Sequence, residues 1–351
     1  MKPPTQMRKK SDVAIPAENL LAFLREWADG FEAGQIFLTA LELDVFSELV
    51  RPSRADELAA KLGIHTELTD KLLNVLVGMK MLERTKEGYR TASTVAPYLA
   101  KDSPRFARYL NHCIQIRESI SHLKNFLYAG PKLLPESEPH SITVDDMDWR
   151  ERISMAVHHD DVMRHIKTMP EFQKARTLMD LGSGNGRFAI AFALENHSLK
   201  VVVFDRPYFI DSTRDNIEKY GLSKRVQTMA GDFMCDDVGT GYDIVFEACA
   251  FDGDDVDFRL FTRKISSSLN IGGLFICLTF SIDDDRNGPL LPLIWNLKNY
   301  LTGSGHRLIR SNAAIVQMLT WAGLEIKEII DMSSWCNTPV RLFITRKVSR
   351  I

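Results

Sequence analysis

The stretch that most constrains this chain is residues 177–188, TLMDLGSGNGRF. Its apolar beginning predicts a short buried strand, its three glycines at alternate positions predict a tight turn, and the residues from Arg187 onward predict the start of a helix. Because glycine has no Cβ, a ligand can lie directly against the backbone at a helix start, where free N–H groups favour it. The stretch therefore predicts a ligand site between a strand and a helix.

The spacing of these glycines narrows the choice of ligand. The dinucleotide fingerprint G-x-G-x-x-G would place its third glycine at position 187, but the chain has Arg187 there. The observed pattern is D-x-G-x-G-x-G, running from Asp180 to Gly186. This spacing argues against NAD as the ligand.

Two further predicted strands are followed by acids. Residues 199–205, LKVVVFD, end in Asp205, which is placed to accept hydrogen bonds from both hydroxyls of a ribose. Such bonds to a charged acceptor contribute roughly 1.5–3 kcal/mol each, so an acid here selects for ribose. The next strand is followed by Gly231, Asp232 and Phe233. There the Asp232 carboxylate can accept a hydrogen bond from the amino group of adenine, and the Phe233 ring can cover the face of the adenine.

These three motifs, in this order and spacing, resemble the S-adenosylmethionine (SAM) motifs of class I methyltransferases; three ordinary turns of a doubly wound fold are the alternative. The resemblance implies that the glycine turn holds the methionine part of SAM, the acid of the second strand the ribose, and the Asp-Phe pair the adenine. It also implies S-adenosylhomocysteine (SAH) as the product. The residues implied to bind the cofactor are Asp180, Gly182, Ser183, Gly184, Asp205, Arg206, Gly231, Asp232, Phe233 and Glu247.

The first part of the chain carries a second resemblance. Residues 39–49, TALELDVFSEL, resemble the opening helices of the plant-type small-molecule O-methyltransferases, which include the caffeic acid and hydroxyindole enzymes. Residues 17–50 also place many large apolar side chains at helical spacing, more than one small domain can cover. The resemblance implies a homodimer formed through this region; packing of the C-terminal domain on the same face is the alternative.

Residues 53–92 predict a winged helix-turn-helix, with two helices followed by a hairpin. Such a unit could bind DNA, but its basic and acidic residues nearly balance, which is unlike a phosphate-binding face. We therefore interpret it as a dimerisation element and keep a DNA-binding regulator as an alternative. The expected organisation is a disordered tail at 1–16, a winged-helix dimerisation domain at 17–103, linking helices that contribute to the acceptor pocket at 104–170, and a SAM-binding domain at 171–351.

The C-terminal half alternates strand and helix patterns, which predicts an α/β fold with helices on both faces of a mostly parallel sheet. The expected architecture is a Rossmann-like, doubly wound sheet of seven strands, with its last strand antiparallel as in the methyltransferase class. Further strands are expected at 243–248, 274–280, 325–331 and 340–348, and helices at 104–129, 147–169, 211–220, 257–269 and 311–322.

Composition limits the partners. The chain has 351 residues with 44 basic and 46 acidic side chains, so it has no general attraction to nucleic acid or an anionic membrane, and a small-molecule acceptor is expected. Five scattered cysteines favour a reducing cytoplasm over a disulfide framework. His158, His159 and Asp161 could suggest a metal, but adjacent helical residues point about 100° apart, so no metal is expected.

The catalytic set of the O-methyltransferases is changed in this chain. The family has His-Asp-Trp after its fourth strand, with the His as the base that deprotonates the acceptor hydroxyl. This chain has CAFDGDD at residues 249–255. Matching the Asp places Phe251 at the base position, whereas matching the start of the strand places Asp252 there. The family also has two glutamates in its catalytic set, and this chain has Thr279 and His306 at the matching positions.

Three hypotheses follow for the chemistry. His306 or Asp252 acts as the base, or the acceptor needs none because proximity and orientation suffice, or the chain binds cofactor without turnover as a regulatory or assembly partner. The receiving atom could be O, C, N or S. The acceptor pocket implied by the family pattern is lined by Met155, His158, Met163, Phe251, Trp295, Asn296 and Tyr300.

Overall fold

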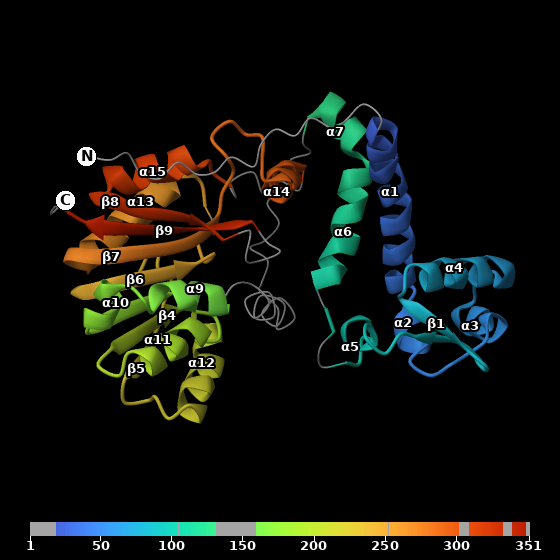
Figure 1. Cartoon of the computed structure of the whole chain (residues 1–351), viewed down its shortest axis with the longest axis horizontal. Coiled ribbons are helices and arrows are strands. Elements are labelled where there is room, and N and C mark those ends of the chain that lie inside the picture. Colours follow the sequence, from blue (N-terminus) through green and yellow to red (C-terminus); the bar gives the residue numbers. More distant parts are fainter. Residues whose placement is uncertain are drawn as a thin grey trace. The chain divides into compact units, whose positions relative to one another are not determined.

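The computed structural model describes residues 19–103, 106–107, 109–130, 159–251, 253–301, 309–332 and 339–348 (Figure 1). The chain divides into two compact units, and the boundary falls between Gln115 and Ile116. The first unit is mainly helical, and the second contains the large sheet.

The first unit is a winged helix preceded by one long helix. Leu73 and Leu76 of the second helix of the helix-turn-helix pack with Phe46 in a core from which water is excluded. Tyr89 of the wing donates its hydroxyl hydrogen to Asp70 at 2.7 Å, which ties the hairpin to the helix. The elements are α1 (Leu20–Glu42), α2 (Val45–Glu48), α3 (Ala55–Leu62), α4 (Thr66–Gly78), β1 (Leu82–Thr85), β2 (Gly88–Thr91), α5 (Ala96–Leu99) and α6 (Tyr109–Ser121), which crosses the boundary.

The second unit alternates strands and helices as predicted. Its strands are β3 (Thr177–Leu181), β4 (Lys200–Asp205), β5 (Val226–Ala230), β6 (Tyr242–Ala248), β7 (Leu269–Phe280), β8 (Leu324–Asp331) and β9 (Val340–Lys347). Its helices are α7 (Leu123–Ala129), α9 (His159–Ile166), α10 (Pro170–Lys174), α11 (Arg187–Glu195), α12 (Pro207–Lys219), α13 (Asp255–Ser268), α14 (Leu290–Leu301) and α15 (Asn312–Trp321).

The seven strands form one sheet in the order β5-β4-β3-β6-β7-β9-β8. The first five of these run parallel, and β9 is antiparallel to both of its neighbours. The predicted fold class and the antiparallel last strand are therefore confirmed. Strand order reverses between β3 and β6, and ligands of doubly wound sheets bind outside the carboxyl ends of the strands at such a reversal.

Alternate side chains of the strands face two separate cores. Leu178 belongs to the core under α9, α10 and α11, whereas the next residue, Met179, belongs to the core under α13 and α15. Figure 1 shows these two groups of helices on opposite faces of the sheet. On the first face Phe188 and Phe192 of α11 pack on Phe246 of β6, with ring centroids 4.7 and 5.0 Å apart. This packing fixes the start of α11 above the end of β3.

Several boundaries differ from the predictions for local reasons. α12 starts at Pro207, earlier than predicted, because a proline in the first turn needs no N–H partner. β7 starts at Leu269, before the predicted 274, because Gly272 and Gly273 form a bulge inside the strand. A Cβ at Gly273 would lie 2.9–3.1 Å from three carbonyl oxygens. The helix expected at 104–129 is interrupted at His122, and α10 and α14 were not predicted. The helix expected at 147–169 lies mostly outside the described residues, with α9 as its described part.

Candidate functional site

The glycine turn follows β3 directly and has the backbone that only glycine adopts readily. Gly182 and Gly184 have φ angles of +69° and +59°. A Cβ on Gly182 would lie 2.2 Å from the Cβ of Ala250, in the loop after β6, so no other residue fits. A Cβ on Gly184 would meet no atom within 4 Å. The turn therefore presents bare backbone to an open space at the reversal of strand order.

Two buried acids hold this turn in place. Asp180, which is 2% exposed, accepts hydrogen bonds from the Ser183 hydroxyl at 2.8 Å and from the Ala189 N–H at 3.0 Å. Asp205, which is 6% exposed, accepts from the N–H groups of Gly184 at 2.6 Å and Arg206 at 2.7 Å. The ends of β3 and β4 and the start of α11 are thus joined through two carboxylates.

The turn after β5 lies against the same place. The Gly231 N–H donates to the backbone carbonyl of Asp205 at 2.9 Å, and an Arg206 nitrogen lies 3.9 Å from the Asp232 carboxylate. The Phe233 ring lies 4.0 Å from the Cβ position of Gly182 and packs on Phe261 of α13, with centroids 5.4 Å apart. The structure therefore brings together the three turns that the sequence singled out.

These turns surround an acidic region. Asp180, Asp205 and Glu247 are all buried at the ends of neighbouring strands. Burial raises the pKa of Asp180 from 3.8 to about 7; hydrogen bonds from Ser183 and Ala189 oppose this rise, and the Asp205 and Glu247 charges add to it. A ligand that carries positive charge is favoured in such a region, because it offsets the repulsion among the carboxylates.

Glu247 faces the loop after β6. Its carboxylate accepts hydrogen bonds from the N–H groups of Ala250 and Phe251, the second at 3.0 Å, and from the Cys277 thiol at 2.9 Å. Burial raises its pKa, and the hydrogen bonds from Cys277, Phe251 and Ala250 oppose this rise. The described contacts of Glu247 thus organise a loop, and cofactor contact by Glu247 stays a prediction.

The loop after β6 carries Phe251, which one of the two matches to the family pattern places at the base position. The Phe251 ring packs on Phe258 and Phe261 of α13, with centroids 5.0 and 4.9 Å apart. The Arg310 guanidinium lies over Phe258, 4.7 Å from its centroid, and pairs with Asp255 at 2.8 Å. Phe251 cannot take a proton, so the other candidate bases become important. Both of them, Asp252 and His306, lie outside the described residues.

The remaining predicted acceptor residues have different surroundings. The Trp295 ring meets Phe280 edge to face at the end of β7, with centroids 4.7 Å apart. The Asn296 amide donates to the Ile309 carbonyl at 2.9 Å and accepts from its N–H at 2.8 Å, so it holds backbone. Met163 is buried in the core under α9. Met155 and His158 lie outside the described residues, as does the side chain of Tyr300.

Three residues at the site were not predicted. Ala250 touches the glycine turn, the Thr213 hydroxyl donates to the Gly184 carbonyl at 2.5 Å, and Lys264 donates to three carbonyls of the turn after β5. Each acts across a large sequence separation, and no local pattern marks it. His159, next to the predicted His158, is the first residue of α9, and its ring contacts Phe188 at the start of α11, with centroids 4.9 Å apart.

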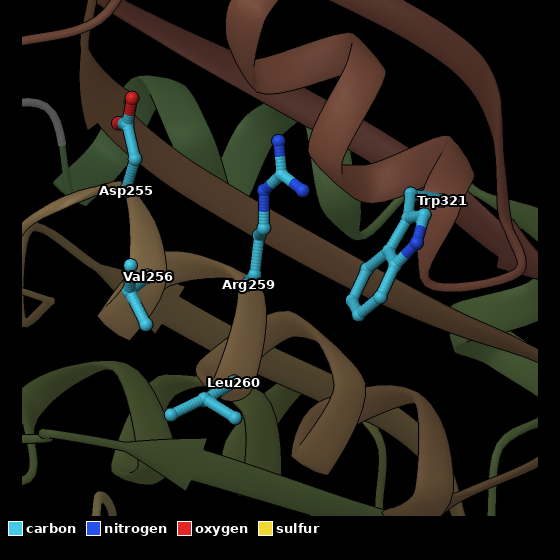
Figure 2. Close-up of a pocket in the computed structure, with 5 residues that line it drawn as sticks. All are labelled: Asp255, Val256, Arg259, Leu260 and Trp321. Atoms are coloured by element: carbon cyan, nitrogen blue, oxygen red, sulfur yellow. The ribbon is translucent and has the colours of Figure 1, made fainter.

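Other kinds of site were sought in the same residues. Within the described ranges, His, Cys, Asp and Glu side chains form no group of three that could hold a metal. None of the described helices has the length and apolar character needed to cross a bilayer. Figure 2 shows a surface pocket lined by Asp255, Val256, Arg259 and Leu260 of α13 and by Trp321 of α15. None of the predicted cofactor or acceptor residues lines this pocket.

Comparison with known proteins identifies the fold and its activity. Residues 141–325 match the O-methyltransferase domain and residues 26–102 the O-methyltransferase dimerisation domain. An uncharacterized protein of Methanocaldococcus jannaschii is 31% identical over 84% of this chain and 82% of its own length. The S-adenosyl-L-methionine-dependent methyl transferase PigF of Serratia is 24% identical over 87% of this chain and 90% of its own length.

A solved structure shares the fold over nearly the whole chain. Human N-acetylserotonin methyltransferase, solved in complex with SAM, is 20% identical, covers 98% of this chain and all of its own chain, and superimposes with a TM-score of 0.68. These matches support an enzyme that uses SAM, and they do not support the alternatives of a cofactor-binding regulator or a DNA-binding protein. The chain belongs to the O-methyltransferase family and is a SAM-dependent methyltransferase that acts on small molecules.

Proposed function

We propose that the three turns hold SAM in the order that the motifs suggest. Gly182, Ser183 and Gly184 present backbone to the methionine part, Asp205 accepts the ribose hydroxyls, and Asp232 and Phe233 hold the adenine. When bound, SAM supplies an electrophilic methyl group on a cationic sulfur. The residues present fit this ligand, because Gly184 borders open space and the surrounding buried carboxylates favour a cation. Hydrogen bonds from the backbone N–H groups of Gly184 and Arg206 hold the Asp205 carboxylate beside the glycine turn.

We further propose that the acceptor supplies its own ionised nucleophile. The observation that supports this proposal is the packing of Phe251 on Phe258 and Phe261. In the match that aligns the family's Asp with Asp252, this hydrocarbon ring takes the base position. A positioned base typically contributes roughly 10²- to 10⁴-fold to a rate. An acceptor whose own pKa is low needs no such help, and alignment with the sulfonium is then sufficient. A small phenol of low pKa, or a carbon activated by a phenolate, fits these requirements.

We expect kcat/KM to depend on the pKa of the acceptor and not on an ionisable group of the enzyme. In a series of substituted phenols, kcat/KM at fixed pH should rise as the acceptor pKa falls, while ionisation is incomplete. The rise should stay below about tenfold per unit of acceptor pKa, because a less basic phenolate is also a weaker nucleophile. His306→Gln should keep kcat/KM within about threefold of the parent enzyme, because a lost base would cost roughly 10²-fold or more. Methyl transfer from labelled SAM measures both.

Two results would contradict this assignment. If kcat/KM follows one enzyme group near pH 6.5 for every acceptor, and His306→Gln abolishes that dependence, His306 is the base. If kcat/KM instead depends on an enzyme group that titrates at acidic pH, and Asp252→Asn abolishes that dependence, the base is Asp252. Tight SAH binding without turnover of any acceptor would instead favour a binding protein.

We also propose that the first unit forms a homodimer through α1. Leu20, Leu24, Trp27 and Phe31 follow one another at helical spacing along one stripe, and Trp27 and Phe31 are 58% and 64% exposed. The match of residues 26–102 to a dimerisation domain supports a second copy of this chain as the partner. Residues 104–170 would then link this domain to the catalytic one and contribute to the acceptor pocket.

A charge on the α1 stripe should separate the copies. Trp27→Glu combined with Phe31→Glu is expected to raise the dimer dissociation constant at least about a hundredfold, because buried aromatic anchors carry much of an interface's affinity and each charge would be buried twice in a twofold interface. Light scattering after gel filtration measures the mass. Glu26→Gln, on the same helix, is the control. A double variant with an unchanged mass at low concentration would exclude the stripe as the interface.

A further inference from the structure

Lys264 on α13 binds the turn after β5 through all of its donors. Its ammonium group donates to the backbone carbonyls of Phe233 at 2.9 Å, Met234 at 3.2 Å and Asp236 at 2.8 Å. An ammonium has three N–H donors, and here each finds a carbonyl of the same turn. The side chain is half-buried, so these contacts are shielded from water more than those of a surface lysine.

The turn itself resembles a single turn of helix. The N–H groups of Cys235 and Asp236 donate to the backbone carbonyl of Asp232, at 3.0 and 2.7 Å. The Asp232 N–H donates in return to the Asp236 carboxylate at 2.8 Å. The carbonyls that leave such a turn carry partial negative charge, and a cation placed against them is stabilising. Lys264 therefore fixes the end of the turn in the way a basic residue fixes the end of a helix.

Fixing the turn also fixes the two side chains proposed to hold adenine. The Asp232 carboxylate accepts from the Met234 N–H at 2.9 Å, and the carbonyl of that same residue is bound by Lys264. The Phe233 ring packs on Phe261, which lies one helical turn before Lys264 on α13. Backbone and ring of Phe233 are thus both held by one helix. A shift of this turn would move the carboxylate and the ring together.

We propose that Lys264 is a positioning residue that sets the selectivity of the cofactor site for adenine. The proposal rests on the assignment of Asp232 and Phe233 to the adenine, made above. In this proposal Lys264 acts through its contacts with the turn and not by binding the ligand itself. It acts by keeping the Asp232 carboxylate where it accepts the 6-amino group, a contact that rejects a base carrying an oxygen at that position.

The test compares two ligands that differ only at that position. SAH carries the 6-amino group, and its inosine analogue carries a 6-oxo group, which would face the Asp232 carboxylate. The parent enzyme should bind SAH at least about tenfold more tightly than the analogue, the value of one hydrogen bond to a charged acceptor. Lys264→Met should reduce this preference below about threefold, mainly by weakening SAH. Lys264→Arg should restore most of it, because a guanidinium can donate to the same carbonyls. Isothermal titration measures each affinity.

Controls separate this inference from the cofactor assignment. Arg263→Met removes a charge from the neighbouring position of α13 and should leave the preference unchanged. Asp205→Ala, titrated in parallel, tests the ribose contact. Suppose that Asp205→Ala weakens SAH binding, while Lys264→Met either keeps the preference for SAH or weakens the binding of both ligands equally. The proposed role of Lys264 is then refuted, and the cofactor site stands. If neither variant weakens SAH, the cofactor site itself is refuted. If Lys264→Met does not fold, Lys264→Gln replaces it, and a preference kept at the parent value refutes the role.

Discussion

Asp205→Ala is expected to weaken the affinity for SAM and for SAH at least about tenfold. The substitution removes the acceptor proposed for the ribose hydroxyls, and one hydrogen bond to a charged acceptor contributes roughly 1.5–3 kcal/mol. It also removes the acceptor of the hydrogen bonds that the N–H groups of Gly184 and Arg206 donate to Asp205 in the parent protein. Both effects act on the same turn, so the loss should exceed that of a single contact. Isothermal titration with SAH gives the dissociation constant directly.

Two companion variants make the Asp205 result specific. Asp205→Asn keeps one oxygen acceptor and the shape of the side chain, so its affinity should fall between those of the parent and the alanine variant. Asp211→Ala removes a carboxylate that is 89% exposed on α12 and serves as the surface control. An alanine variant that folds normally and binds SAH as the parent does would show that the ribose lies elsewhere.

Asp180→Asn is expected to change how stability depends on pH. Burial raises the pKa of Asp180 to about 7 in the folded protein, above its ordinary 3.8. Between these values the folded state holds a proton that the unfolded chain has released, so the stabilisation is fully present at low pH and is lost as pH rises through 7. Asparagine does not titrate. The free energy of unfolding of the parent, relative to Asp180→Asn, should therefore fall by about 2 kcal/mol from pH 5.5 to pH 7.5.

Urea unfolding of both proteins at several pH values, without cofactor, measures this difference. Both described hydrogen bonds to Asp180 end on the same carboxylate oxygen, and an amide oxygen can accept them as well. The variant should therefore fold, and its loss of pH dependence should reflect the missing carboxyl group. Asp211→Asn is the matched surface control. Parallel curves for the parent and Asp180→Asn would show that the buried carboxyl does not hold its proton near neutral pH.

The parts of the fold that could be predicted are those encoded locally. A strand that contains Asp180, a turn of glycines and a following helix are encoded in twelve consecutive residues, and the structure has all three. The same holds for the acids after β4 and β5, because parallel strands bring their carboxyl ends to one edge of the sheet. Seven strands with an antiparallel member also followed from the alternation and the family resemblance.

The parts that could not be predicted depend on contacts between distant segments. Lys264 meets the turn after β5 across about thirty residues, and its pattern on α13 is that of an ordinary half-exposed lysine. The family pattern implies a cofactor contact for Glu247, whereas its described hydrogen-bond partners are the N–H groups of Ala250 and Phe251 and the thiol of Cys277. Which way a buried carboxylate turns is decided by the donors available in three dimensions, and a sequence pattern does not give these.

Because Gly182 and Ala250 are in contact, substitutions in the two loops that carry them constrain each other. The turn proposed to receive SAM and the loop after β6 meet with room for only one methyl group. A larger side chain at either position requires the other loop to move away or to carry a smaller residue. Diversification toward new acceptors in this chain is therefore confined to paired changes, or to positions that leave this narrow contact untouched.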